Sequence, residues 1–240
     1  MEEIDGVYCH VECGGKGQGV VLLHGWGQNA SMMRLLQCQL QEKYRVVNMD
    51  LPGFGESVPI KETWQMNDYV EFLHMLIERY QLEDPILIAH SFGARIAIKY
   101  AAVYPVSSMI LTGAAGLHMP LSVYKRVKQL LYHFSRSLQL SFSFGSQDYR
   151  AADPVMRRVL VQAVNDDVAP LLERIHCPVL LVWGSKDQQT PLWMGKKMER
   201  LLPQAKLIVY QGEDHFAYYH QGFRFLDDIE QFLGVTGCCG

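Results

Sequence analysis

A serine directly after a buried strand is the residue that most clearly points to chemistry. The apolar run Ile86-Leu87-Ile88-Ala89 predicts the strand, and an apolar helix begins immediately after Ser91. This is the context of a nucleophile elbow, a strained strand-to-helix turn that exposes a hydroxyl group. Ala89 stands where such turns often have glycine, and Gly93 keeps the second small position. The pattern predicts Ser91 as a nucleophile; the alternative is a serine that caps an ordinary turn.

A candidate general base follows the last predicted strand, residues 206–210. His215 lies in the loop after that strand, whereas its nearest rival, His220, lies at an expected helix start. A histidine base must be neutral, so we expect activity to fall below about pH 6.5, the ordinary histidine pKa. His215 is therefore the predicted base; the alternative is a surface-loop histidine.

A candidate acid precedes the histidine, in the chain order expected on this type of fold. Asp187 lies just beyond the strand 179–183, and residues 112–121, where some relatives carry the acid, contain no Asp or Glu. Such an acid fixes the tautomer of the imidazole and stabilises the imidazolium. We therefore predict a catalytic triad of Ser91, Asp187 and His215; the alternative for Asp187 is a turn or capping role.

A glycine-containing turn, His24-Gly25-Trp26-Gly27, follows the first predicted parallel strand. The two glycines allow the backbone to point an amide into the site. We predict an oxyanion hole made by the backbone N–H groups of Trp26 and Phe92. His24 and Asp50 are expected to hold their loops by hydrogen bonds. The expected substrate pocket is lined by Trp26, Leu117, Tyr124 and Phe216.

Short apolar runs that alternate with helical patterns must position these residues. Runs that are apolar on both faces are typical of a parallel sheet covered by helices. The fold class predicted is therefore α/β, a doubly wound and mostly parallel sheet, with residues 7–13 as an added N-terminal edge strand. The expected strands are 19–23, 44–49, 85–89, 108–112, 179–183 and 206–210, and the expected helices are 31–42, 66–80, 92–103, 193–202 and 222–233.

Residues 113–178 form a connection far longer than one crossover helix needs. Ser122 can cap a helix with an apolar face, and Asp153-Pro154 has the pattern of an N-cap followed by the first helical residue. We predict a small helical cap over residues 117–170, inserted into a core of residues 1–116 and 171–240. The alternative is two ordinary sheet-packing helices joined by a long loop.

Composition limits the class of protein. Of the 240 residues, 49% are hydrophobic and 20% charged, which is typical of a globular domain. The net charge of −3 argues against a nucleic-acid partner, and no apolar run approaches the roughly 20 residues that span a bilayer. The acidic N-terminus lacks the pattern of a signal peptide. The six cysteines show neither metal-ligand nor disulfide-scaffold spacing, so we expect a reduced, cytoplasmic protein with no metal or other cofactor.

The predicted cap carries more basic than acidic residues. Its functional interpretation is an acidic partner, such as a carrier protein or a carboxylated acyl substrate; the alternative, which we weight more, is a solvated helix face. Within residues 118–160, the basic residues are Lys125, Arg126, Lys128, Arg136, Arg150, Arg157 and Arg158, against the acidic Asp148 and Asp153.

Taken in order, these motifs resemble the α/β-hydrolase superfamily, specifically its capped carboxylesterase group. The matching stretches are 24–27, 50–55, 89–93, 184–187 and 214–215. Within that group, His24-Gly25-Trp26-Gly27 and Leu51-Pro52-Gly53-Phe54-Gly55 are similar to the pimeloyl-carrier-protein methyl ester esterases. The resemblance implies hydrolysis without a cofactor and leaves the substrate open.

The type of nucleophile narrows the reaction. A serine forms an acyl-enzyme, whereas the aspartate of dehalogenases and epoxide hydrolases of this fold attacks alkyl carbon. We predict a serine hydrolase acting on small acyl esters. The alternatives are the same triad used for thioester, lactone or carbon–carbon hydrolysis, perhydrolysis or aminopeptidase activity, or a non-catalytic binding protein of the same fold.

Overall fold

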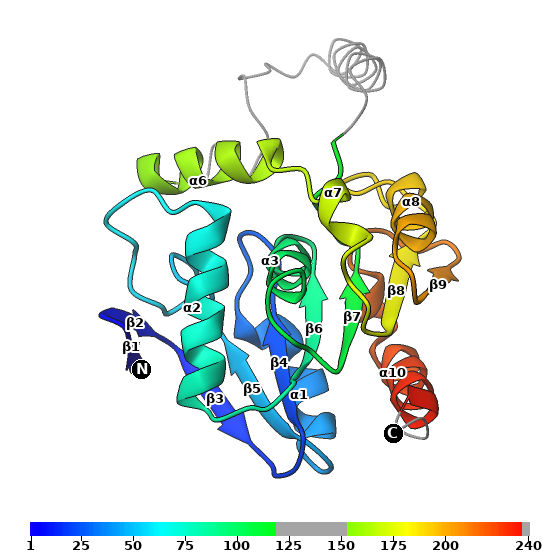
Figure 1. Ribbon diagram of the computed structural model, residues 1–240, viewed down its shortest axis with the longest axis horizontal. Helices are drawn as coiled ribbons and strands as arrows, with labels where there is room; N and C mark the ends of the chain where they lie inside the picture. Colours follow the sequence, from blue (N-terminus) through cyan, green and yellow to red (C-terminus); the bar gives the residue numbers. More distant parts are fainter. Residues whose placement is uncertain (119–152, 237–240) are drawn as a thin grey trace.

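A seven-stranded sheet forms the centre of the molecule (Figure 1). The computed structural model describes residues 1–118 and 153–236. Within them, the first strand of the sheet is antiparallel to its neighbour and the other pairs are parallel. In spatial order the strands are β3 (Val11–Gly14), β5 (Arg45–Met49), β4 (Gly19–Leu23), β6 (Ile86–His90), β7 (Ser108–Thr112), β8 (Val179–Gly184) and β9 (Ala205–Tyr210).

The strands are apolar on both faces because helices cover both sides of the sheet. In β4, Val21 and Leu23 pack into one hydrophobic core, while Val20 and Leu22 pack into the other. In each of β4, β6 and β7, all five residues are buried. Continuous apolar runs of this kind are what a parallel sheet between two helical layers requires.

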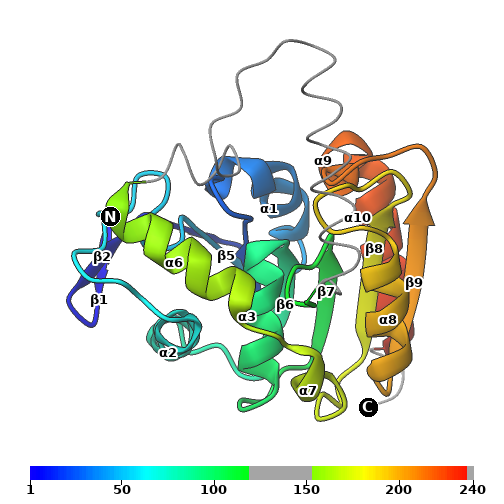
Figure 2. The same ribbon diagram turned by 90° about the horizontal axis from the view of Figure 1, so that it is seen from above.

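The helices form one layer on each face of the sheet (Figures 1 and 2). The layer with α2, α3 and α8 covers the larger core, and the layer with α1 and α10 covers the second. The helices are the 3₁₀ turn η1 (Ala30–Met33), α1 (Arg34–Leu40), α2 (Met66–Arg79), α3 (Phe92–Ala101), α6 (Pro154–Asn165), α7 (Ala169–Leu172), α8 (Trp193–Leu201), α9 (Ala217–His220) and α10 (Gly222–Thr236).

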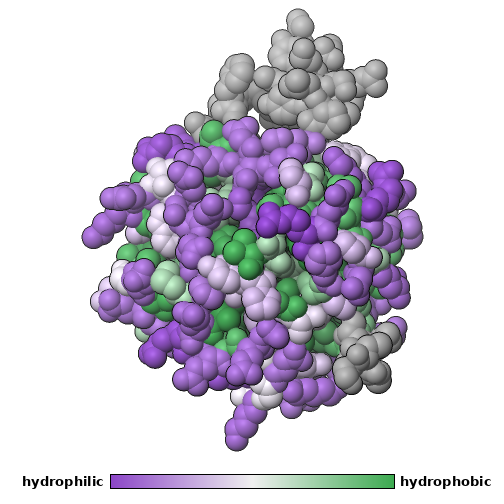
Figure 3. Space-filling view, viewed as in Figure 1, coloured by the Kyte–Doolittle hydropathy of each residue, from purple (hydrophilic) through white to green (hydrophobic). Residues whose placement is uncertain are grey.

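Local sequence signals start two of these helices. The side chains of Gln65 and Asp68 form a reciprocal capping box at the start of α2. Asp153 accepts hydrogen bonds from the amides of Val155 and Met156 at the start of α6. Pro154, at the first helical position, has no N–H group that would need an acceptor. The helices turn polar faces outward, so hydrophilic residues dominate the face in Figure 3 and hydrophobic patches are small and scattered.

The fold class expected from the sequence is confirmed, with one error at the N-terminus. The six parallel strands lie within one residue of their predicted bounds. Residues 7–13, however, are not a single edge strand: β2 (Val7–Cys9) pairs with β1 (Glu2–Ile4) in a hairpin, and β3 joins the main sheet. The strand is interrupted at His10, whose amide donates to the Ser57 hydroxyl and whose carbonyl accepts from the Asp50 amide.

Helix α6 is anchored to the core by its C-terminal end. The buried guanidinium of Arg95, on α3, donates to the backbone carbonyls of Ala163 and Asp166, and burial lowers the pKa of Arg95 to about 10. Lys99 adds an ion pair with the Asp166 carboxylate at 2.8 Å. Asp153-Pro154 thus begins a helix as expected, whereas the helix expected after Ser122 lies outside the described residues.

None of the helices that the structure describes is both long and apolar enough to cross a membrane.

Candidate active site

Loops that follow the parallel strands meet at one edge of the sheet. Because β4, β6, β7, β8 and β9 run in the same direction, their carboxyl ends lie at the same edge. The loops after these strands carry the predicted oxyanion turn, Ser91, Asp187 and His215. Ligand sites of open α/β sheets form at this edge, so the topology brings the predicted site residues to one region.

Ser91 occupies a strained turn between β6 and α3. Its backbone has φ +48° and ψ −105°, a region that residues with a Cβ atom rarely adopt. The Ser91 amide donates to the Thr112 carbonyl at 3.0 Å, and the Ser91 carbonyl accepts from Ala115 at 3.1 Å. A Cβ atom at Gly93 would lie 2.6 Å from the carbonyl oxygens of Leu23 and His24. Tight packing against β4 therefore explains the glycine and holds the serine in place.

Asp187 and His215 form a buried hydrogen-bonded pair. The distance from Asp187 Oδ2 to His215 Nδ1 is 2.8 Å, and the side chains are 0% and 4% exposed. Because a carboxylate only accepts, Nδ1 carries the hydrogen and Nε2 keeps its lone pair. Asp187 Oδ1 accepts from the amides of Gln189 and Thr190, both at 2.9 Å. The carboxylate is therefore held by its own loop while it orients the imidazole.

His220, the rival for the base, lies elsewhere, next to Asp214. Asp214 Oδ1 accepts from the Phe216 amide at 2.9 Å and lies 3.5 Å from His220 Nδ1. His220 ends α9, its side chain is 46% exposed, and it also contacts Glu213. This pair forms a surface cluster beside the buried one.

Sequence reasoning missed two residues that contact the pair. The Thr190 hydroxyl lies 2.8 Å from Asp187 Oδ2 and 3.2 Å from His215 Nδ1. Gly113 has φ +50°, and a Cβ atom there would lie 3.0 Å from His215 Nδ1. The spacing of Thr190 three residues after Asp187 is a local turn signal, but it gives no sign of contact with the histidine.

His90, next to the nucleophile, lies against the ring of His215. The two ring centroids are 4.6 Å apart. The Nδ1 atom of His90 contacts the Thr112 carbonyl at 3.0 Å, and its buried Nε2 atom has no hydrogen-bond partner in the part of the chain described. Burial, and then the neighbouring His215, hold the pKa of His90 well below the ordinary value. His90 is thus a neutral ring beneath the site.

The loop after β4 is fixed by its own histidine, as expected. His24 Nδ1 donates to the Gly25 carbonyl at 2.7 Å, and Nε2 accepts from the Leu51 amide at 2.9 Å. Burial lowers the pKa of His24 to about 4, which keeps the ring neutral and suited to both bonds. Neither the Trp26 nor the Phe92 amide donates to another group within residues 1–118 and 153–236. Both N–H groups are thus available to an oxyanion.

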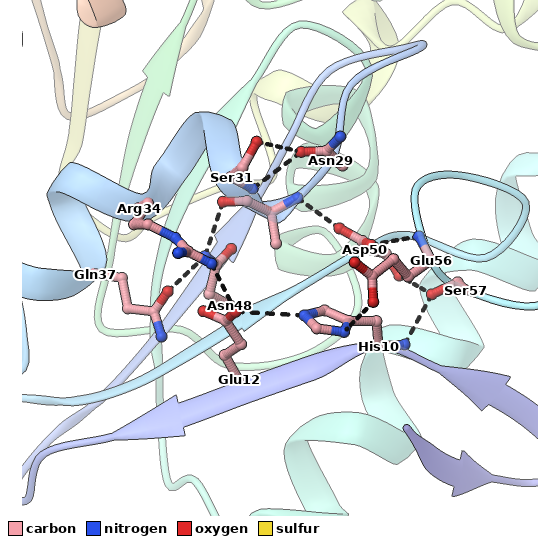
Figure 4. A network of polar contacts seen from close by, with 11 residues as sticks. His10, Glu12, Asn29, Ser31, Arg34, Gln37, Asn48, Asp50, Glu56 and Ser57 are labelled. Carbon is pink, nitrogen blue, oxygen red and sulfur yellow. Dashed lines mark hydrogen bonds and ion pairs between the residues drawn. The ribbon is translucent and has the colours of Figure 1, made fainter.

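Asp50 joins this loop to the turn after β5 (Figure 4). Its buried carboxylate accepts from the amides of Ala30 at 2.6 Å and Glu56 at 2.7 Å. Beside it, His10 lies 3.4 Å from carboxylate oxygens of both Glu12 and Glu56. Asp50 therefore has the structural role predicted from the sequence, supported by a polar network on its outer side.

Aromatic rings form one wall of the site. Trp26 meets Phe54 and Phe92 edge to face, with ring centroids 4.9 Å and 5.3 Å apart. Phe216 lies 5.5 Å from the His215 ring on the other side, and Leu117 is buried in the core that also contains Phe92. The remaining predicted pocket residue, Tyr124, lies outside the described residues.

The arrangement has the parts that nucleophilic catalysis needs. It places at one sheet edge a strained serine, a buried acid–imidazole pair and two amides that have no partner among the described residues. Among the described residues, no cluster of His, Cys, Asp and Glu could hold a metal ion.

Comparisons with known proteins identify the family of the chain. A family model described as the alpha/beta hydrolase family matches residues 20–227. The pimeloyl-[acyl-carrier protein] methyl ester esterase of Aliivibrio fischeri is 22% identical over 248 residues, which cover 91% of this chain and 95% of that protein.

Two solved structures have similar folds. An esterase from Exiguobacterium antarcticum has a TM-score of 0.79 at 22% identity, covering 96% of this chain and 97% of its own; at that identity the likeness shows the fold alone. A meta-cleavage product hydrolase from Pseudomonas fluorescens has a TM-score of 0.76 at 25% identity, covering 95% of both chains.

Proposed function

The chain belongs to the alpha/beta hydrolase family, and from that premise we propose that it is a serine hydrolase that cleaves carboxylic esters of small acyl substrates through an acyl-enzyme on Ser91. One observation carries the proposal above the others. The buried Asp187–His215 hydrogen bond of 2.8 Å lies at the sheet edge where the strained Ser91 turn begins. A base oriented by an acid, together with a serine on an elbow, constitutes the machinery of acyl transfer.

In the acylation step, His215 Nε2 accepts the proton of the Ser91 hydroxyl as Oγ attacks the ester carbonyl carbon. Asp187 stabilises the imidazolium through the hydrogen bond to Nδ1. The tetrahedral intermediate then collapses, and His215 returns the proton to the departing alcohol. In the second step, His215 takes a proton from a water molecule as the water oxygen attacks the acyl carbon. When the bond between the acyl carbon and Ser91 Oγ breaks, His215 returns that proton to Oγ, which releases the acid and restores the free serine.

The developing negative charge needs donors that are already in place. The amides of Trp26 and Phe92 are the proposed pair. Trp26 lies in the glycine turn held by His24. Phe92 is the first residue of α3, where the helix dipole favours an anion. Donors of this kind contribute roughly 10²- to 10³-fold each.

A series of p-nitrophenyl esters of increasing acyl length tests the proposal. Wild-type protein should hydrolyse the short esters, and Ser91→Ala should lower kcat by roughly 10⁶-fold, because the members of a triad act as a unit. Binding of the ester should persist in the variant. Retention of a tenth of the wild-type rate would exclude Ser91 as the nucleophile.

Carbon–carbon hydrolysis is the second candidate. The observation that favours it is the meta-cleavage product hydrolase of similar fold at 25% identity. A vinylogous diketone, tested beside the ester series, distinguishes the two reactions. A higher kcat/KM on the diketone than on every ester would replace the ester proposal while keeping Ser91, His215 and Asp187.

We further propose that residues 117–170 form a cap whose basic residues meet an acidic substrate or carrier protein. The support comes from the sequence, because the basic side chains exceed the acidic ones there. Reversal of Lys125, Lys128 and Arg136 to Glu should lower kcat/KM for an acidic ester at low salt and leave a neutral short ester unchanged. Unchanged kcat/KM on both esters would mean that the charges are only a solvated surface, and equal losses on both would mean that the substitutions damaged the cap itself.

We also propose that the protein is located in the reducing environment of the cytoplasm. Its support is the state of Cys9, Cys13, Cys38 and Cys177, which form no disulfide among the described residues. Rapid alkylation of thiols in freshly lysed cells should label the exposed Cys13 and Cys38, and their isolation as disulfides would contradict the proposal.

A further inference from the structure

Thr190 makes contacts that the proposed triad chemistry does not yet use. Its hydroxyl lies 2.8 Å from Asp187 Oδ2, 3.2 Å from His215 Nδ1 and 3.0 Å from the Gly113 carbonyl. The residue is 5% exposed, so water does not compete freely for these bonds. The hydroxyl therefore lies within hydrogen-bonding distance of both members of the acid–base pair.

The single hydrogen of this hydroxyl has two acceptors within reach, and charge decides between them. A hydrogen bond to a carboxylate is stronger than one to a neutral carbonyl, and Asp187 Oδ2 is also the nearer acceptor. If the hydrogen faced Gly113 instead, two oxygen lone pairs would face each other across 2.8 Å. The Thr190 hydroxyl is therefore a donor to Asp187 Oδ2, the oxygen that also accepts from His215.

We infer that Thr190 is a positioning residue of this site. Its hydroxyl, together with the Gln189 and Thr190 amides on Oδ1, fixes the rotation of the Asp187 carboxylate so that Oδ2 faces His215. The same hydrogen bond withdraws negative charge from Oδ2, which weakens its attraction for a protonated imidazole and keeps His215 a neutral base to lower pH. The inference rests on the proposed function, because it assigns Thr190 a part in that same triad.

Among the described residues, the other groups near His215 do not contact the Asp187 carboxylate through a side-chain hydrogen bond. Gly113, at φ +50°, has no room for a side chain beside Nδ1. Of the titratable groups on neighbouring elements, His90 of β6 contacts the ring and stays neutral. Glu213 and Asp214, on the loop of His215 itself, lie against His220 at 3.3 Å and 3.5 Å.

Thr190→Val tests the inference because it removes the hydroxyl at nearly constant shape, and Thr190→Ser restores it. For Thr190→Val, kcat on a short ester should fall roughly tenfold, since one hydrogen bond to a charged group is lost, while KM stays unchanged. The midpoint of the acid limb of the kcat/KM–pH profile should move to higher pH. Thr190→Ser should return both quantities toward the wild type. Should the valine variant not fold, Thr190→Ala should give the same two directions.

Ser108→Ala is the matched control, because it removes a buried hydroxyl from the far end of β7. It should leave kcat and the acid limb at wild-type values. Wild-type kcat and an unmoved acid limb in Thr190→Val would overturn the inference, even with a lowered unfolding temperature. A serine variant that resembles the valine variant would do the same.

Ser91→Ala, measured in the same assay, distinguishes a failure of the role of Thr190 from a failure of the proposed function. If Ser91→Ala is inactive and Thr190→Val is normal, the role of Thr190 is wrong and the proposed function stands. If Ser91→Ala retains a tenth of the rate, the proposed function fails and the role of Thr190 fails with it.

Discussion

The loops after β4 and β9 each carry a buried histidine at the same sheet edge, yet the two rings have different kinds of hydrogen-bond partner. Both ring nitrogens of His24 are engaged by the neutral backbone, at Gly25 and Leu51. His215 contacts the charged Asp187 through Nδ1. His24 therefore has no nitrogen left for a substrate, whereas the Nε2 atom of His215 has no hydrogen-bond partner among the described residues.

The hydrogen-bond partner, more than burial, distinguishes the structural imidazole of His24 from the proposed catalytic imidazole of His215. The rings are almost equally buried, at 0% and 4% exposure. Protonation of His24 would add a hydrogen to Nε2 and break the bond to the Leu51 amide, and burial already lowers its pKa to about 4. Protonation of His215 adds a hydrogen to the free nitrogen while a carboxylate stabilises the new charge. Each prediction below tests this contrast.

Removal of the two imidazoles should produce the largest difference. His215→Gln should lower kcat on a short ester by roughly 10⁶-fold, because the members of a triad act as a unit. His220→Gln is the control, since that side chain lies 46% exposed on α9, and it should stay within about twofold of the wild type. If His220→Gln were the more damaging change in initial-rate measurements, the base would be wrongly assigned.

Replacement of the acid should lower kcat less than replacement of the base does, but the loss should still be large. Asp187→Asn should keep the fold and lower kcat by about 10⁴-fold, because the amide stabilises the wrong tautomer of His215. Asp214→Asn, one residue from the histidine, should have little effect because its carboxylate lies against His220 and the Phe216 amide. A larger loss in Asp214→Asn than in Asp187→Asn would identify Asp214 as the acid.

The structural imidazoles should make stability depend on pH. The pKa of His24 is lowered to about 4 and that of His90 lies well below the ordinary value, so the unfolded chain binds protons more readily. Their contribution is present above about pH 6.5, the unfolded value, and is lost as pH falls toward 4. For His24 the loss is roughly 3 kcal/mol.

Urea unfolding at pH 8, 6 and 5 measures this loss. His24→Asn should be less stable at pH 8, since two buried hydrogen bonds are lost, but its free energy of unfolding should fall less steeply between pH 6.5 and 5. The exposed His176→Gln is the control and should keep the wild-type slope. A wild-type slope in His24→Asn as well would show that His24 is not held neutral by the fold.

The parallel strands and the serine turn were predictable because their signals are local. The central strands β4, β6 and β7 are short apolar runs buried on both faces, and Ser91 lies between such a run and a helix. The N-terminal hairpin was missed although Asp5-Gly6, both at positive φ, is a strong turn signal. The interruption of the strand at His10 could not be predicted from neighbouring residues, because it depends on contacts with Ser57 and Asp50, far along the chain.

Contacts between distant loops explain what the sequence did not show of the site. The Thr190 hydroxyl meets the Gly113 carbonyl across 77 residues of sequence and His215 across 25. His90 meets His215 only because β6 and the loop after β9 end at the same sheet edge. Residue type and chain order suggested Ser91, Asp187 and His215, but only the folded chain reveals the groups that surround them.

The most direct test of the central claim is the site of labelling by a fluorophosphonate, which phosphonylates an activated serine with loss of fluoride. The account predicts one adduct per chain, located on Ser91 by peptide mass spectrometry, absent in Ser91→Ala and strongly slowed in His215→Gln. An adduct on another residue, or no adduct under conditions that label a known serine esterase, would contradict the claim that Ser91 is a nucleophile activated by His215.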